Sequence, residues 1–272
     1  MNIYICDLDG TLLDSNKRLP EDFKETLELI KKNNDMFFIA SGRSYEDVCK
    51  YYNDIDYPIN AICDNGAEVY IDGVSRYQKH LVDSDSKKII DKYLELDFGI
   101  LMLSTSNQTY RIMPTDYDTN DDEMMKEFYL KSIEVKSYKE IESPILKIAI
   151  GTNKGANDYL YNDYTDLVLE ATHPVVSGFG WIDFVHNTVN KGTGINHMLE
   201  LLGLDSNDAY CFGDYLNDIT MVDCSKHTFA MKNSHQTILD LFDEVIDSND
   251  NWGVTKKIKE IINTKYKKRF IV

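Results

Sequence analysis

The sequence predicts an α/β protein, in which a parallel sheet core is covered by helices and carries an inserted α+β module. Apolar runs of four or five residues alternate with segments of helical periodicity in the N-terminal and C-terminal parts of the chain, a pattern typical of parallel sheets. In between, from about residue 83 to residue 187, paired strands dominate. At 272 residues the chain can form one large domain or two modest ones.

The N-terminal part of the chain predicts alternating strands and helices. A short buried strand ends in Ile3–Cys6, and Pro20 is expected to open a helix. The apolar positions of that helix, at helical spacing, are Phe23, Leu27 and Ile30. Met36–Ala40 predicts a second strand, and a short helix and a third strand near 59–63 follow it.

The C-terminal third of the chain repeats this alternation. A helix is expected at 192–203 with Gly203 as its stop, and strands are expected at 209–212 and 228–231. The apolar face of the helix at 192–203 is formed by Ile195, Met198, Leu199 and Leu202, and that of a closing helix by Val254, Ile258 and Ile261.

The middle of the chain predicts a different organisation. A helix near 87–96 precedes paired strands at 99–104 and 110–113, and a hairpin-like stretch covers 175–185. The alternating residues Leu146, Ile148 and Ile150 predict a half-buried strand. We therefore expect a core at residues 1–82 and 188–272 and an inserted α+β domain at residues 83–187.

The composition excludes several classes of function. A formal net charge of −17 disfavours binding to nucleic acid, and a phosphate site would need a metal ion, a lysine or backbone N–H groups as local positive charge. Five cysteines, an odd number without a CxxC pair, indicate a reducing cytoplasm. No signal peptide and no run of membrane-spanning length is present, so no membrane partner is expected, and the oligomeric state is left open.

Polar segments follow three of the predicted strands. Asp7-Leu8-Asp9 comes after the first, Ser41-Gly42-Arg43 after the second and Gly213-Asp214 after a later one. Because parallel sheets bind ligands outside the carboxyl ends of their strands, these three segments are expected to meet at one edge of the sheet.

The residue types in these segments indicate a metal and phosphate site. Asp7 and Asp9 repel each other when both are ionised, and a divalent cation or a shared proton removes that cost. Oxygen ligands favour Mg²⁺, and Asp214 can complete its site. Lys191, at a helix N-terminus, can hold a phosphate. The alternative is a structural role: solvated turns for the first two aspartates, helix caps for Asp214 and Asp218, and a solvated side chain for Lys191.

These segments, in this order, resemble the motifs of the haloacid dehalogenase (HAD) superfamily of phosphatases. Asp7–Thr11 matches its DxDGT motif, Ser41 and Lys191 match its second and third motifs, and Gly213–Asp218 matches its GDxxxD motif.

A finer pattern resembles the Cof-type subfamily of that superfamily. SGR at 41–43, NGA at 65–67, KG at 191–192 and GDxxNDxxM at 213–221 all match it. The inserted module matches the type IIB cap of the subfamily. The resemblance covers essentially the whole chain and implies a Rossmann-like core with a substrate-specificity cap.

The resemblance also implies a role for each residue. Asp7 is the nucleophile and Asp9 the general acid and base. The metal is Mg²⁺, held by Asp7, by the backbone carbonyl of Asp9 and by Asp214. The expected phosphate ligands are Leu8, Ser41, Gly42, Lys191 and Asn217. Arg43 and Asp218 have supporting roles, Asp218 by orienting Lys191 or a metal-bound water.

Three functions are therefore compared. The first is a Mg²⁺-dependent phosphatase that hydrolyses a small phosphorylated metabolite, such as a sugar phosphate, through an aspartyl-phosphate. The second is a phosphomutase, in which the same intermediate donates to a sugar. The third is a non-catalytic binding protein, which is expected to lose Asp7, Asp9 or Lys191, and the chain retains all of them.

Overall fold

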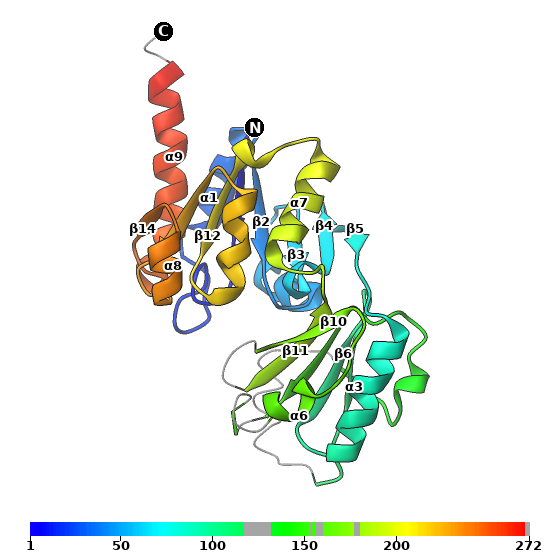
Figure 1. Ribbon diagram of the computed structural model, residues 1–272. Helices are drawn as coiled ribbons and strands as arrows, with labels where there is room; N and C mark the ends of the chain where they lie inside the picture. Colours follow the sequence, from blue (N-terminus) through cyan, green and yellow to red (C-terminus); the bar gives the residue numbers. More distant parts are fainter. Residues whose placement is uncertain (117–131, 153, 156–159, 177–179, 270–272) are drawn as a thin grey trace. The chain divides into compact units, whose positions relative to one another are not determined.

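The computed structural model describes residues 1–116, 132–152, 154–155, 160–176 and 180–269 of the chain (Figure 1). The chain divides into two compact units. The first comprises Met1–Ser41, Val48–Arg76 and Asn190–Val272, and the second comprises Gly42–Asp47 and Tyr77–Val189. The domain boundaries expected from the sequence, after residues 82 and 187, stay a prediction. Among the described residues, no helix combines the length and the apolarity needed to cross a bilayer.

The first unit is built on an eight-stranded sheet of order β14-β13-β12-β1-β2-β3-β4-β5. The strands are β1 (Ile3–Cys6), β2 (Met36–Ala40), β3 (Ala61–Cys63), β4 (Glu68–Ile71), β5 (Val74–Gln78), β12 (Ala209–Gly213), β13 (His227–Met231) and β14 (Glu244–Ile246). All neighbours from β14 to β3 pair in parallel, and β4 pairs antiparallel with β3. The predicted α/β fold class with a parallel sheet is thus confirmed.

The order of the strands creates a switch point beside β1. Cys6 at the end of β1 pairs with Ile39 of β2 on one side and with Phe212 of β12 on the other. The chain runs outward from β1 through β2 to β3, and it returns to the other side of β1 through β12. Ligands bind at such a point, outside the carboxyl ends of the strands.

Helices of the first unit pack in two groups. The bounds of the helices are α1 (Phe23–Lys32), η1 (Lys50–Tyr52), η2 (Asp64–Gly66), α7 (Lys191–Leu202), η4 (Ser206–Asp208), η5 (Leu216–Cys224), α8 (Gln236–Leu241), η6 (Asn249–Asn251) and α9 (Gly253–Arg269). The short helix α2 (Tyr45–Cys49) has residues in both units. Helix α1 lies against α9, and α7 lies against η5. Burial of Ile195, Met198 and Leu199 confirms most of the apolar face predicted for α7, whereas Leu202 is only partly buried.

Two details of the helices differ from the prediction. Helix α1 begins at Phe23 rather than at Pro20, because Pro20 forms the turn before it and accepts a hydrogen bond from the Phe23 N–H. Among the residues of α9 with described side chains, the buried apolar ones are Val254, Ile258 and Ile262, whereas Ile261 is only partly buried. Spacing of four residues, rather than of three, keeps these side chains on one face.

Strands β4 and β5 were not predicted from the sequence. They are joined at Asp72 and Gly73, which have φ values of +52° and +75°. An Asp-Gly pair with positive φ at both residues is the signature of a tight turn between strands. The Asp-Gly pair is visible in the sequence and could have predicted this turn. Strands β4 and β5 extend the sheet beyond its parallel part.

The second unit has a six-stranded sheet of order β10-β11-β9-β6-β7-β8. Its elements are α3 (Asp83–Leu96), β6 (Ile100–Ser104), β7 (Thr109–Ile112), β8 (Ile133–Glu134), η3 (Tyr138–Glu140), β9 (Lys147–Gly151), α6 (Tyr161–Thr165), β10 (Thr172–Val176) and β11 (Trp181–His186). Pairing is antiparallel except between β7 and β8. This confirms the expected α+β organisation, although residues 177–179 of the predicted hairpin lie outside the described part.

Strand β9 corrects one expectation. The alternation of Leu146, Ile148 and Ile150 predicted a half-buried strand, but all five residues of β9 are buried. Ile148 and Ile150 pack with residues of α3 and α6 in one apolar core, whereas Ala149 packs with Ile100 and Met102 in another. Both faces of the strand are therefore covered.

Candidate active site

Asp7 stands at the carboxyl end of β1. Its N–H donates to the Phe212 carbonyl at 2.9 Å, which continues the pairing of β1 with β12 by one residue. The loop after it turns back at once, because Leu13 N–H donates to the carbonyl of buried Leu8 at 2.9 Å. Gly10 has a φ of +81°, and a Cβ there would come within 2.4 Å of Asp214 Oδ2. Glycine at position 10 therefore leaves room for the Asp214 carboxylate beside the loop that carries Asp7.

Asp214 reaches the same point from β12. Its Oδ1 accepts a hydrogen bond from Thr11 Oγ1 at 2.6 Å, which ties it to the loop after β1. Asp218, in the first turn of η5, accepts hydrogen bonds through Oδ2 from the N–H groups of Asp214 and Tyr215, at 2.9 and 3.0 Å. Asp218 thus caps the start of η5, which is the structural role considered for it in the sequence. Its other oxygen, Oδ1, contacts a different residue.

Lys191 connects the carboxylates. As the first residue of α7, after the capping residue Asn190, it is completely buried, so the alternative of a solvated lysine is wrong. Its Nζ donates to Asp7 Oδ1 at 2.5 Å and to Asp218 Oδ1 at 2.6 Å. The two roles expected for Asp218, orienting Lys191 or a metal-bound water, stay predictions, and the hydrogen bond from Lys191 is the contact that supports the first.

The electrostatics of this cluster are dominated by burial. Burial raises the pKa of Asp7 well above its usual value, against the opposing effect of Lys191. Burial also raises the pKa of Asp214, from 3.8 to about 6. For Lys191, burial would lower the pKa, but the carboxylates of Asp218 and Asp7 outweigh it and raise the pKa above the usual value. One lysine faces three carboxylates, so an additional positive charge is favoured here.

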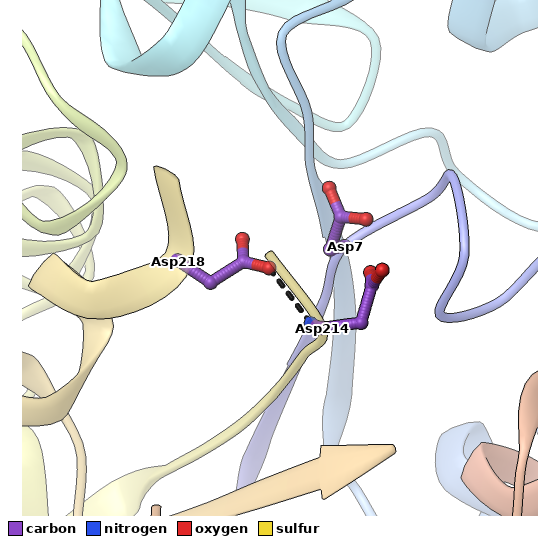
Figure 2. Close-up of side chains that lie close together, drawn as sticks. All are labelled: Asp7, Asp214 and Asp218. Carbon is purple, nitrogen blue, oxygen red and sulfur yellow. Dashed lines mark hydrogen bonds between the residues drawn. The ribbon is translucent and has the colours of Figure 1, made fainter. Parts of the chain in front are cut away.

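A divalent metal ion fits this position. Oxygen atoms of Asp7, Asp214 and Asp218 lie within 4.8 Å of one another, and Figure 2 shows the three carboxylates converging from β1, β12 and η5. Because both Asp218 oxygens already accept hydrogen bonds from Lys191 and the backbone, Asp7 and Asp214 are the better metal ligands. Hard oxygen donors of this kind favour a cation such as Mg²⁺. The ligand set expected from the sequence also includes the backbone carbonyl of Asp9, which stays a prediction.

The side chain of Asp9 is held by a residue that sequence reasoning missed. Lys17 Nζ donates to Asp9 Oδ1 at 2.8 Å. Lys17 has a φ of +59° and lies in a turn fixed by Asp14, which accepts hydrogen bonds from the Asn16 and Arg18 N–H groups at 2.8 Å. The cluster of polar residues at 14–18 indicates a turn, but nothing in the sequence shows that the turn delivers a lysine to Asp9.

Ser41 and Asn217 occupy the same edge of the first unit. Ser41 is buried at the end of β2, and its N–H donates to the Ile62 carbonyl at 2.9 Å. Asn217 Nδ2 donates to Asn65 Oδ1 at 3.2 Å. In the sequence Asn65 stands out only as part of the NGA pattern, and no local signal predicts its hydrogen bond with Asn217.

Gly42 and Arg43 belong to the second unit. The Gly42 carbonyl accepts a hydrogen bond from Lys147 Nζ at 2.7 Å. Arg43 is buried, with Nη1 3.9 Å from Asp47 Oδ2. The roles expected of Gly42 in phosphate binding and of Arg43 in support stay predictions.

Comparison with known proteins agrees with this geometry. Residues 4–258 match the family of haloacid dehalogenase-like hydrolases, and the chain belongs to that family. It is 22% identical to the 5-amino-6-(5-phospho-D-ribitylamino)uracil phosphatase YbjI of Escherichia coli, with 96% of both chains covered. The chain is an enzyme of the phosphatase kind.

Solved structures share the fold. The structure of SMU.1108c from Streptococcus mutans matches with a TM-score of 0.85 and 22% identity, over 97% of this chain and 99% of that one. The sugar phosphatase BT4131, of HAD subclass IIB, matches with a TM-score of 0.78 and 18% identity, over 96% and 99%. The expected HAD fold with an inserted cap is thus confirmed.

Proposed function

We propose that the protein is a Mg²⁺-dependent phosphatase that hydrolyses small phosphomonoesters through an aspartyl-phosphate on Asp7. One observation carries this proposal: the Asp7 carboxylate, at the switch point of the sheet, lies between a buried lysine at 2.5 Å and the carboxylate of Asp214. A nucleophile between a fixed positive charge and a metal site suits phosphoryl transfer, which depends on positioning and charge neutralisation.

In the first half of the reaction, an Asp7 oxygen attacks phosphorus. The bond between phosphorus and the ester oxygen breaks, and the leaving oxygen takes a proton from the Asp9 carboxyl group. Lys191, Asn217 and the Ser41 hydroxyl hold the phosphate oxygens. The product alcohol departs, and the phosphoryl group stays on Asp7.

In the second half of the reaction, the Asp9 carboxylate is protonated again. It takes a proton from a water molecule, which attacks the phosphorus and releases inorganic phosphate. Asp7 regains its carboxylate, and Asp9 is again protonated for the next cycle. Mg²⁺, held by Asp7, Asp214 and the Asp9 carbonyl, supplies charge neutralisation to the phosphate when it is bound.

The proposed substrates are sugar phosphates or related metabolites. Both the YbjI phosphatase and BT4131 carry names that place a phosphate on a sugar or a sugar-like chain. We assign the choice of substrate to the proposed cap at residues 83–187. A reducing cytoplasm is the proposed location, in agreement with five free cysteines of which four are buried.

The test is an assay of phosphate release with a panel of phosphorylated sugars, sugar alcohols, nucleotides and an aryl phosphate, with and without Mg²⁺. We expect activity that favours the sugar phosphates, is lost on chelation of the metal, and falls at least about 10³-fold in Asp7→Asn. Full activity of Asp7→Asn would contradict the proposal.

The same panel separates a phosphatase from a phosphomutase. Each sugar phosphate is incubated with the enzyme, and isomerised sugar phosphate is compared with free phosphate by NMR. A hydrolase gives free phosphate at the rate of substrate loss. Isomerised product without phosphate release would instead identify transfer to a sugar.

A further inference from the structure

The loop after β3 links three segments of the candidate active site. Asn65 N–H donates to the Ser41 carbonyl at 3.0 Å, and Asn65 Oδ1 accepts from Asn217 Nδ2. A Cβ at Gly66 would come within 2.1 Å of the carbonyl oxygen of Asn190, directly before Lys191. The segment η2 therefore contacts the residue after β2, the residue before α7 and the first turn of η5.

The backbone of this loop is held in an unfavourable conformation. Asp64, Asn65 and Gly66 follow one another with φ values of +48°, +56° and +104°. Residues other than glycine avoid this left-handed region, although asparagine and aspartate tolerate it best. Non-glycine residues in this conformation gather at functional sites, where the surrounding structure fixes them. Here the conformation turns the Asn65 side chain, which is 7% exposed, toward Asn217.

We infer that Asn65 is a positioning residue for phosphate binding. Its amide oxygen accepts one hydrogen bond from the Asn217 side-chain NH₂ group, and this contact orients the second N–H of that group toward the phosphate. This inference rests on the proposed function, in which Asn217 binds phosphate. An NH₂ group has two hydrogens, and Asn65 Oδ1 takes one of them. A reversed Asn217 amide would place its oxygen against Asn65 Oδ1 and against the phosphate, so both contacts select the same orientation.

The experiment is a double-mutant cycle on full-length protein, with KM, kcat and the inhibition constant of inorganic phosphate as readouts. Asn65→Gly removes the amide and suits the positive φ. We expect KM and the phosphate inhibition constant to rise together by about five- to tenfold, with kcat changed less than about twofold, because one ground-state hydrogen bond loses its alignment.

The cycle distinguishes positioning from a general structural effect. If Asn65 acts through Asn217, the double variant Asn65→Gly, Asn217→Ala should match Asn217→Ala within about twofold. Independent effects that multiply would overturn the inference. So would a lower melting temperature of Asn65→Gly with unchanged phosphate inhibition.

Asn34→Gly is the matched control. Asn34 also has a positive φ, of +55°, but it is exposed and precedes β2, at the opposite end of that strand from Ser41. We expect wild-type kinetics from this variant. Kinetic changes equal to those of Asn65→Gly would show that loss of any left-handed asparagine suffices, and they would overturn the inference.

A second variant keeps the test decisive if Asn65→Gly does not fold. Asn65→Asp retains an acceptor oxygen and a residue type that tolerates positive φ. In this background, Asn217→Ala should raise the phosphate inhibition constant by the same factor as in the wild type. No further effect of Asn217→Ala would overturn the inference. Absence of Mg²⁺-dependent phosphate release from the wild type would instead reject the proposed function itself.

Discussion

The two units of the chain bury their charged side chains in different places. In the first unit, Asp7, Lys191 and Asp218 lie beyond the carboxyl ends of parallel strands. In the second unit, Lys147 and Asp183 lie inside neighbouring strands, β9 and β11, with Nζ and Oδ2 3.8 Å apart and both side chains at most 5% exposed. Charges beyond strand ends can meet a ligand, whereas Lys147 and Asp183 face each other inside the sheet, and Lys147 Nζ also donates to the Gly42 carbonyl at 2.7 Å. We therefore expect both clusters to contribute to stability and only the first to govern activity.

Lys191→Met, in the first cluster, is expected to have the largest effect on activity among the variants that compare the two clusters. Removing Lys191, which donates to both Asp7 and Asp218, leaves two buried carboxylates without this cation. We expect kcat/KM to fall on the order of 10³-fold, as for other fixed charges that stabilise a transition state. Unfolding in urea should show a loss of about 3–5 kcal/mol as well.

Lys256→Met is the control for this variant. Lys256 forms an exposed ion pair with Asp247 at 2.9 Å in the same unit. Because exposed pairs contribute about 0–1 kcal/mol, this variant should keep both activity and stability. Similar losses in the two variants would contradict a special role for Lys191.

Lys147→Met tests the second unit. It leaves Asp183 buried without its nearby cation, and we expect a loss of about 3 kcal/mol in the free energy of unfolding. The double variant Lys147→Met, Asp183→Leu should recover most of it, because no unpaired charge stays buried. Denaturant unfolding followed by fluorescence measures both.

Lys92→Met is the matched control in the second unit, since Lys92 pairs with exposed Glu95 on α3 at 3.5 Å. It should change stability by less than about 0.5 kcal/mol. The contrast between the units would fail if Lys147→Met lowered turnover of a small aryl phosphate as much as Lys191→Met does.

The smallest expected effect depends on pH and concerns the first unit alone. Burial raises the pKa of Asp214 from 3.8 to about 6 in the folded protein. The protonated carboxyl group therefore favours folding below pH 4, and this contribution is lost as the pH rises through about 6. Bound Mg²⁺ offsets the ionised carboxylate, so its affinity should rise about fourfold between pH 5.5 and pH 7.5.

The measurement is the shift of the melting temperature on addition of Mg²⁺ at these two pH values. The shift should be larger at pH 7.5. Asp214→Asn should reduce both the shift and its dependence on pH. A larger shift at pH 5.5 would contradict the assignment of Asp214 to the metal.

Much of the first unit could be predicted because its signals are local. Ile3–Cys6 and Met36–Ala40 were predicted with their observed bounds, and the polar residues after them follow from the geometry of parallel sheets. The sequence did not reveal the Asp9 to Lys17 pair, the Asn217 to Asn65 bond or the pairing of Lys147 with Asp183. Each depends on turns or strand order that bring distant residues together, and no local pattern encodes it.

The position of β1 between β2 and β12 has a consequence for the newly made protein. The hydrogen bonds that complete the site join residues 184 and 203 positions apart, from Asp7 to Lys191 and from Thr11 to Asp214. At about 5–20 residues per second, a ribosome needs roughly 10–40 s to proceed from the first member of the Asp7–Lys191 pair to the second. During that interval β1 lacks its β12 neighbour, and Asp7, the proposed nucleophile, has no lysine beside it. In the proposed mechanism, catalysis therefore begins only after the chain has been synthesised past Asp218.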